Sequence, residues 1–198
     1  MAPQPIAGLL LTGGASKRMG VDKASLPLVG GGTPASRVAA ALAVHTSPTV
    51  QVGRRAVQLP WVPDRWPGQG PLAAVASGLE ALGAVGYRGP VLVVACDLPL
   101  LTPAVVALVA NWPGDSTVVP VVDGRAQPLC ARYGSEALAA VPELMAAGAR
   151  SMRALLDATT AVEWLGDERW EVVAEAAAFA DVDRPEDLRR LGLEVAGS

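Results

Sequence analysis

A glycine pair and a group of basic residues follow the first apolar run of the chain. The residues concerned are Leu11, Thr12, Gly13 and Gly14, followed by Lys17, Arg18 and Lys23. Glycine has no Cβ, so its backbone can approach a ligand closely and direct N–H groups at it. The two lysines are the only ones in the chain, every other basic residue being arginine. The stretch favours a loop that binds phosphate or nucleotide; the alternative is a simple turn with solvated cations.

Two better-known phosphate motifs do not fit this loop. A Walker loop ends in Gly-Lys-Ser/Thr, and a dinucleotide fingerprint has three glycines spaced around a turn that opens a helix. Neither pattern occurs in "LLLTGGASKRMGVDKA". The loop therefore indicates phosphate chemistry of some other kind.

A single carboxylate follows the apolar run Val91 to Ala95. Asp97 stands two residues after that run, where an unpaired charge at the edge of a sheet would be costly. Mg²⁺ bridging the carboxylate to triphosphate oxygens would offset the cost, since Mg²⁺ prefers hard oxygen ligands. The alternative role, capping the next helix, is already filled by Thr102 before Pro103. We expect Asp97 to bind metal.

Three other aspartates are weaker candidates. Asp181 and Asp183 are two residues apart, so on an extended strand their side chains would face the same way. Asp183 could be a second metal ligand, or its charge could simply be favoured near a helix N-terminus. Asp64 lies in the Gly/Pro-rich stretch "VPDRWPGQGPL", where its residue type alone indicates a turn.

The elements that must position these residues alternate along the chain. Short apolar runs bounded by Gly and Pro alternate with segments of helical period, which predicts an α/β fold with a mostly parallel sheet covered on both faces. The expected strands are Ile6 to Leu11, Thr49 to Val52, Val91 to Ala95, Thr117 to Pro120, Pro128 to Tyr133 and Ala178 to Val182. Thr33 and Thr102, each followed by proline, predict two helix starts. Ligands of such sheets bind beyond the carboxyl ends of the strands, where Leu11 and Asp97 should meet.

Composition limits the classes of protein. The 198 residues are 51% hydrophobic and 18% charged, which suits one well-packed domain spanning residues 1–198. The formal net charge of −3 argues against a nucleic-acid partner. Cys96, Cys130 and His45 provide neither a disulfide framework nor a zinc site, and Ile6 to Leu11 is too short to span a bilayer. We expect a cytoplasmic protein with no membrane association.

The stretch "TGGASKRMGVDKA" resembles the signature of the molybdenum cofactor guanylyltransferases, nucleotidyltransferases with a Rossmann-like three-layer α/β fold. The resemblance continues in order through "GPLAAVASGLEAL", "VVACDLPLLTP", "QPLCARY", "GARSMRALLD" and "FADVDRPEDL", over nearly the whole chain. It implies that the opening loop wraps the nucleoside triphosphate and that Lys23 contacts the phosphates. It also implies a metal-binding role for Asp97 and a nucleotide contact for Asp64.

The resemblance further implies the reaction. GMP would pass from GTP to molybdopterin with release of pyrophosphate, with Mg²⁺ as cofactor and Arg18, Lys23 and Asp97 as the catalytic groups. Protein partners can include other cofactor-biosynthesis proteins or acceptor molybdoenzymes.

The chain departs from the family pattern at two places. Asp181 and Asp183 replace the two asparagines of an Asn-x-Asn-Thr-Pro motif, as in the related cytidylyltransferases, and Gly53 stands where an asparagine follows the second strand. "GVDKA" argues against the cytidylyl branch, which commonly has proline before the lysine. Cytidylyl transfer to molybdopterin, or transfer to another phosphorylated metabolite, stays as the alternative activity, and a non-catalytic nucleotide or pterin carrier as the alternative of another class.

Four arginines could together bind a second anion, although each alone is more simply explained as solvated or paired: Arg125, Arg132, Arg150 and Arg153.

The assignment of Lys23 predicts the effect of removing it. Lys23→Ala should lower turnover by roughly 10² to 10³, the usual loss for one preorganised donor to developing negative charge. Steady-state pyrophosphate release measures it, and near-normal turnover in this variant would count against the assignment.

Overall fold

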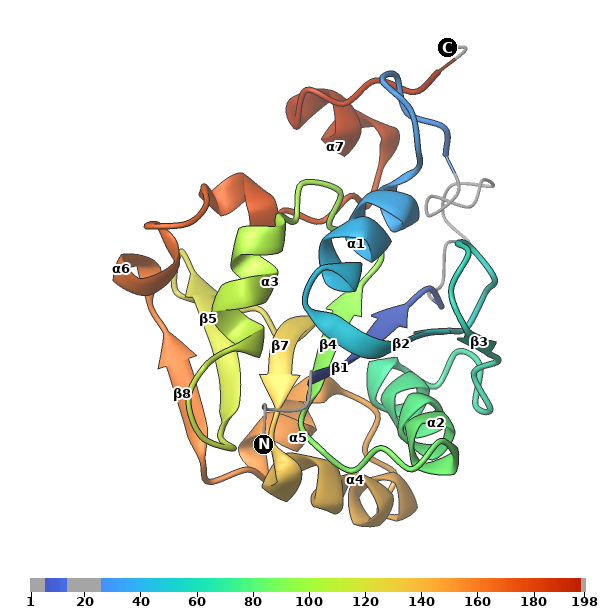
Figure 1. The fold of residues 1–198 in the computed structure, drawn as a ribbon, viewed down its shortest axis with the longest axis vertical. Helices are drawn as coiled ribbons and strands as arrows, with labels where there is room; N and C mark the ends of the chain where they lie inside the picture. Colours follow the sequence, from blue (N-terminus) through green and yellow to red (C-terminus); the bar gives the residue numbers. More distant parts are fainter. Residues whose placement is uncertain (1–5, 14–25, 197–198) are drawn as a thin grey trace.

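The computed structural model describes residues 6–13 and 26–196 of the chain (Figure 1). The strands are β1 (Ile6–Leu11), β2 (Thr46–Val52), β3 (Trp61–Val62), β4 (Val91–Ala95), β5 (Thr117–Val122), β6 (Arg125–Ala126), β7 (Cys130–Tyr133) and β8 (Val162–Leu165). The α-helices are α1 (Pro34–Ala43), α2 (Pro71–Ala84), α3 (Pro103–Ala110), α4 (Ser135–Ala146), α5 (Met152–Asp157), α6 (Asp167–Trp170) and α7 (Pro185–Arg190), with a 3₁₀ helix at Ala176–Phe179.

One sheet runs through the middle of the molecule in the order β3-β2-β1-β4-β7-β5-β6, with β8 paired to β5. Strands β3, β2, β1 and β4 are mutually parallel, and β8 is parallel to β5. Only β6 and β7, among the strands of the described residues, run against their neighbours. The sheet is therefore mostly parallel, as the alternation of apolar runs and helices predicted.

Helices cover both faces of the sheet and make two separate apolar layers. On β1, Leu10 belongs to the layer that includes α1 and α3, whereas Leu9 and Leu11 belong to the layer that includes α2, α4 and α5. Figure 1 shows α1 and α3 together on one side of the strands and α2, α4 and α5 on the other. Because each strand is buried on both faces, its sequence is a continuous apolar run rather than an alternating one. The three-layer α/β architecture is confirmed.

Both predicted helix starts are present. The Thr33 side chain accepts a hydrogen bond from Ser36 N–H at 3.1 Å, and that of Thr102 accepts one from Val105 N–H at 3.3 Å. Each helix has proline in its first turn, where the missing donor is not needed. Among the described residues these are the next helices along the chain after β1 and β4, so the two caps fix where the strand-to-helix connections end.

The strand expected over residues 178–182 is wrong. Residues Ala176–Phe179 form a 3₁₀ helix, and the extended chain after it joins no strand ladder. The segment "AEAAAFA" is rich in alanine, which favours helical over extended backbone. The segment bonds to the chain after β4 at Val182, whose N–H donates to the carbonyl of Asp97 at 2.9 Å.

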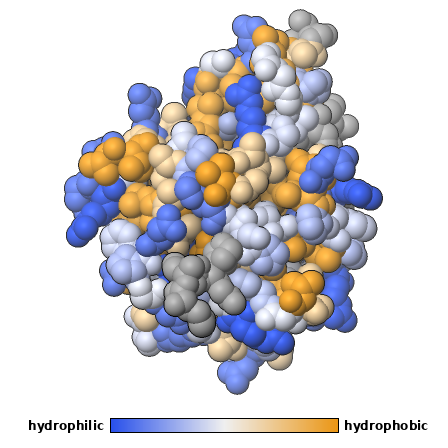
Figure 2. Space-filling view, in the orientation of Figure 1, coloured by the Kyte–Doolittle hydropathy of each residue, from blue (hydrophilic) through white to orange (hydrophobic). Residues whose placement is uncertain are grey.

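The visible face carries small hydrophobic patches separated by hydrophilic side chains (Figure 2). The large hydrophobic residues most exposed on the surface are Val29, Val44, Trp61, Val85, Trp164, Val172 and Val173. No helix among residues 6–13 and 26–196 has the length and apolar character needed to cross a lipid bilayer.

Glu136, in the first turn of α4, holds the turn between α5 and β8. Its carboxylate accepts hydrogen bonds from Thr160 N–H at 3.0 Å, the Thr160 hydroxyl at 2.8 Å and Ala161 N–H at 3.1 Å. The Thr160 N–H and hydroxyl and the Ala161 N–H hold the pKa of Glu136 below its usual value. A lowered pKa means that the charged form stabilises the fold above the unfolded-state pKa of about 4.3, and that this contribution disappears as the pH falls through the folded-state pKa.

We therefore expect Glu136→Gln to lower the free energy of unfolding near neutral pH, and to lower it less at about pH 3. Urea denaturation at the two pH values measures this. Glu163→Gln, which changes an exposed glutamate on β8, is the control. A difference between Glu136→Gln and the parent that does not shrink with acid contradicts the role given to the charge.

Candidate active site

The four parallel strands end side by side at one edge of the sheet. Leu11 of β1 is in register with Val52 of β2 and with Ala95 of β4, and Val52 is in register with Val62 of β3. The residues that follow these ends are therefore brought to the same edge, which is where open α/β sheets bind their ligands. They are Thr12 and Gly13 after β1, Gly53 after β2, Asp64 after β3 and Asp97 after β4.

Thr12 fixes the direction in which the chain leaves β1. The residue is 4% exposed, and its N–H donates to the Val52 carbonyl at 2.9 Å. Its hydroxyl lies 2.9 Å from the same carbonyl and 2.6 Å from the carbonyl of Arg54. Thr12 thus ties the start of the glycine loop to the end of β2, which leaves Gly13 exposed beyond it.

Gly53 packs against Gly13 at a distance that only glycine allows. Its φ is +109°, and a Cβ on it would lie 2.6 Å from the Gly13 nitrogen. The resemblance implied an asparagine at this position, and the sequence alone showed only that the asparagine was missing. A glycine directly after the second strand was the available signal for a close backbone approach.

The backbone places Asp97 next to the β1 loop. The Cys96 N–H donates to the Leu11 carbonyl at 3.1 Å, which extends the β1–β4 ladder by one residue, and Asp97 follows half-buried. The Asp97 carbonyl accepts the Val182 N–H at 2.9 Å. The second acidic segment, far away in the sequence, is thereby brought to the same place.

Asp181 and Asp183 are exposed on either side of Val182, which is 1% exposed. This alternation puts the two acidic side chains on the same side of the segment, although it is not a strand. The Asp187 carboxylate accepts hydrogen bonds from the Arg184 N–H at 2.8 Å and the Asp183 N–H at 2.9 Å. These two bonds hold the pKa of Asp187 below its usual value, and the bond from Arg184 has the larger effect. Arg184 has no oxygen with which to cap α7, and Asp187 reaches back to that position instead.

The carboxylates at this edge suit a Mg²⁺ ion whose remaining ligands are phosphate oxygens of the substrate and water. In the described part of the chain no three His, Cys, Asp or Glu side chains come together as a ready-made metal cage. Mg²⁺ is usually held by one or two carboxylates together with phosphate oxygens and water. Asp97, with Asp183 on the segment bonded to it, provides that number of carboxylates.

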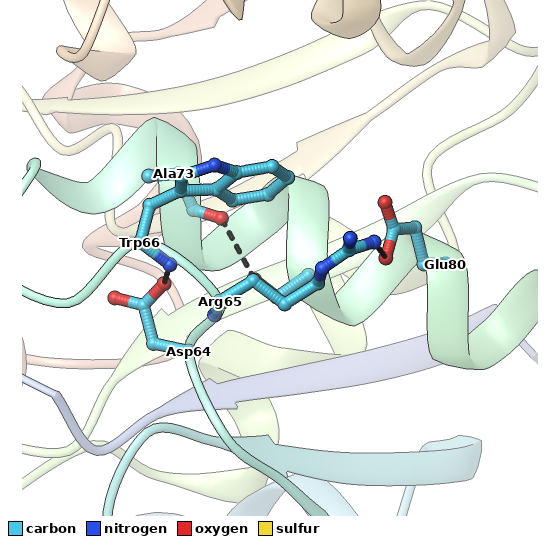
Figure 3. A network of polar contacts seen from close by, with 6 residues as sticks. Asp64, Arg65, Trp66, Ala73 and Glu80 are labelled. Atoms are coloured by element: carbon cyan, nitrogen blue, oxygen red, sulfur yellow. Dashed lines mark hydrogen bonds and ion pairs between the residues drawn. The ribbon is translucent and has the colours of Figure 1, made fainter.

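Asp64 lies at the same edge and makes a turn. Its Oδ1 accepts the Trp66 N–H at 2.9 Å (Figure 3). The next residue, Arg65, holds the turn against α2: its N–H donates to Ser77 Oγ at 3.0 Å, and its guanidinium pairs with Glu80 at 2.5 Å. Figure 3 shows Arg65 reaching toward Glu80 while Asp64 stays beneath Trp66. The turn predicted from the residue type is confirmed, and the nucleotide contact implied by the resemblance stays a prediction.

Some of the site residues predicted from the sequence lie outside the described part of the chain, and one of the predicted arginines has a structural role instead. Gly14, Arg18 and Lys23 belong to residues 14–25, outside the part of the chain described. Among the four arginines, Arg132 is 4% exposed and donates to the carbonyls of Trp112 and Gly114, a structural role.

Of the other three arginines, Arg150 and Arg153 make structural contacts, and Arg125 lies at the edge of the sheet that carries the candidate site. The backbone carbonyl of Arg150 accepts the Leu72 N–H at the start of α2, and Arg153 pairs with Asp157 at 2.7 Å. Arg125 lies on β6 opposite Val122, the last residue of β5. Since β5 runs in the direction of β4, Arg125 is at the edge of the sheet that carries Asp97.

Comparison with known proteins identifies the family. Residues 8–163 match the model of the MobA-like NTP transferase domain. The chain belongs to this family. Its enzyme class is therefore that of the nucleotidyltransferases, as the signature loop predicted.

Relatives and solved structures agree over most of the chain. It is 34% identical to a "Probable molybdenum cofactor guanylyltransferase" of Chloroflexus aggregans, over 93% of this chain and 92% of that one. It is 35% identical to a protein of the same name from Mycobacterium avium, over 94% of each. The structure of molybdopterin-guanine dinucleotide biosynthesis protein A from Archaeoglobus fulgidus has a TM-score of 0.75 at 22% identity and covers 94% of this chain and 96% of its own. At that identity the structural likeness shows the fold, which is confirmed as the nucleotidyltransferase fold.

The contact between Gly53 and Gly13 predicts the effect of adding a methyl group. Gly53→Ala should lose about 1–3 kcal/mol of stability from positive-φ strain, and should also weaken triphosphate binding, because its Cβ displaces Gly13. Gly86→Ala is the matched control, since Gly86 has a φ of +82° but open space around its Cβ position. Thermal unfolding and GTP titration separate the two effects. Equal GTP affinity in the two variants would show that Gly13 does not contact the nucleotide.

Proposed function

We propose that this chain is a molybdenum cofactor guanylyltransferase, which transfers GMP from GTP to the terminal phosphate of molybdopterin. The observation that carries the proposal is the shared sheet edge at which Thr12 and Gly13 lie beside Asp97, in a chain of the MobA-like NTP transferase family. The names of the relatives over almost the full length support the choice of guanylyl transfer and of molybdopterin as acceptor.

The transfer balances without a general base. An oxygen of the acceptor phosphate bonds to the α-phosphorus of GTP, and the bond from that phosphorus to the β-phosphate oxygen breaks, which releases pyrophosphate. A phosphate monoester is largely ionised near neutral pH because its second pKa is about 6. The chain therefore has to position two anions and neutralise their charge rather than remove a proton.

The residues divide these tasks. The backbone around Gly13 and Gly14, with Lys17, Arg18 and Lys23, is proposed to bind the triphosphate, and Asp64 to contact the nucleotide. Asp97, with Asp183 as second ligand, is proposed to hold Mg²⁺. When bound, Mg²⁺ supplies charge neutralisation on the phosphate oxygens. Arg125, on the β5–β6 hairpin at the same edge, is the arginine of the four that we propose to meet a second anion, and its pairing with the last residue of β5 supports this.

One observation favours a second candidate, cytidylyl transfer. Asp181 and Asp183 flank Val182, whose N–H donates to the Asp97 carbonyl, and they stand in place of the asparagines of the guanylyl pattern. No relative named above carries a cytidylyl name for a molybdopterin enzyme, and "GVDKA" keeps the guanylyl form of the signature. GTP is therefore the expected donor.

Pyrophosphate release measured with GTP, CTP and ATP, each with and without molybdopterin, tests donor and acceptor together. We expect release only with GTP and molybdopterin together, and only with Mg²⁺. Turnover with CTP in preference to GTP would transfer the proposal to the cytidylyl branch.

The role of Asp97 is tested by Asp97→Asn, which keeps the shape and removes the charge. We expect Mg²⁺-dependent release to fall by about 10² or more, the loss usual for removing one preorganised electrostatic group. Asp157→Asn is the matched control, because Asp157 is an exposed, ion-paired aspartate at the far end of α5. A carrier protein would instead retain ligand affinity in Asp97→Asn and show no release in either form.

A further inference from the structure

The C-terminal segment, residues 182–196, is bonded both to Asp97 of the candidate site and to the chain that follows the signature loop. At its start, the Val182 N–H donates to the Asp97 carbonyl at 2.9 Å. At its end, the Glu194 carbonyl accepts the Val29 N–H at 2.8 Å, and the Ala196 N–H donates to the Pro27 carbonyl at 2.8 Å. Leu28 and Val195 form an antiparallel bridge between these last two bonds.

Both contacts lie next to residues that the proposed function uses. Asp97 is the proposed metal ligand, and residues 26–29 are the chain that follows the glycine-rich signature. Figure 1 shows α7 beside the blue segment that leads into α1, at the top of the view. One C-terminal segment thus connects the chain that follows the signature with the chain at Asp97.

A small apolar cluster holds this connection together. It is separate from the two main layers, and its fully buried members are Leu28, Val182, Leu188 and Leu193, which are 2%, 1%, 0% and 8% exposed. Leu26 and Leu100 pack against it from the two site segments. The cluster therefore joins the chain after the signature, the chain after Asp97 and the C-terminal segment.

Asp187 adds a polar restraint at the acidic end. Its Oδ2 accepts the N–H groups of both Asp183 and Arg184, so the backbone of Asp183 is held while its side chain stays exposed. Arg190 lies 3.4 Å from the other oxygen of the same carboxylate, one turn along α7. The orientation of Asp183 relative to Asp97 is thus set by a side chain that need not touch metal or substrate.

We propose that residues 182–196 are a positioning element for nucleotidyl transfer, in which Leu193 and Asp187 fix the proposed metal ligands, Asp97 and Asp183, relative to residues 26–29. This inference rests on the proposed function, because it assigns the segment a part in binding Mg²⁺ and triphosphate. Neither residue needs to contact a reacting atom, so both act through Asp97, Asp183 and residues 26–29.

Calorimetric titration with Mg²⁺·GTP in the absence of acceptor tests the proposal without requiring turnover. Leu193→Ala and Asp187→Ala should each weaken the binding of Mg²⁺·GTP by about tenfold or more, the usual effect of removing a group that orients a metal ligand. Asp187→Asn, which keeps an acceptor oxygen, should recover most of the affinity. Leu82→Ala is the matched control, since Leu82 is 1% exposed near the end of α2, at the opposite edge of the sheet.

Hydrogen exchange separates positioning from general loss of stability. In Leu193→Ala, exchange should quicken at the amides of Val29, Cys96 and Val182, while Leu82→Ala should leave these amides slow relative to the rest of the sheet. Should Leu193→Ala not fold, the surface change Asp187→Ala and its Asn counterpart carry the same test.

The outcomes are distinguishable. Affinity for Mg²⁺·GTP equal to the parent in Leu193→Ala and Asp187→Ala overturns the positioning role and leaves the proposed function standing. Equal weakening in Leu82→Ala also overturns it, because any core loss would then suffice. A parent protein that binds no nucleoside triphosphate overturns the proposed function, and the positioning role with it.

Discussion

The hydrogen bond from the Cys96 N–H to the Leu11 carbonyl, at 3.1 Å, is the contact on which the site depends. It continues the parallel ladder of β1 and β4 past Ala95, the last residue of β4, and so fixes the glycine loop and Asp97 as neighbours. On the other side of β1, the Thr12 N–H makes the equivalent bond to β2. Parallel strands end at one edge by their topology, but these two bonds determine which residues stand next to one another there.

The packing beneath keeps β1 in place. Gly78 of α2 lies so close to the strand that a Cβ on it would be 2.6 Å from a methyl carbon of Leu9. On the opposite face, Leu10 is buried completely in the layer made with α1 and α3. Close packing on both faces leaves β1 no freedom to slide, since a shift of one residue would exchange the two faces of its side chains. The site can therefore rely on backbone geometry rather than on a network of buried charges.

Much of this arrangement could be predicted from residue patterns. Continuous apolar runs such as Val91–Ala95 indicate strands covered on both faces, and threonine followed by proline marks the two helix starts, because both signals are local. The position of Asp97 after its strand was likewise sufficient to place it at the carboxyl edge. The signature residues then gave the family, which the comparisons confirm.

What could not be predicted depends on contacts between distant residues. The segment around Val182 looked extended, but its alanines form a 3₁₀ helix and only its end reaches the Asp97 carbonyl, a pairing that no local pattern encodes. Gly53 appeared as a missing asparagine, and its packing against Gly13 depends on the register of β1 and β2. A strand ending at Tyr133 was expected, but its antiparallel pairing with β4, and the bond from the Ala95 N–H to the Leu129 carbonyl just before it, also required the tertiary fold.

The most direct test of the account is amide NMR with Mn²⁺·GTP in place of Mg²⁺·GTP, because paramagnetic broadening falls steeply with distance from the metal. The account predicts that the amide signals of Gly13, Gly53, Asp97 and Asp183 broaden first, while those of α4 and the far end of α2 stay sharp. Sharp signals at Gly13 and Asp97, with broadening centred elsewhere in the molecule, would contradict the claim that one metal-bound triphosphate lies between the glycine loop and this carboxylate.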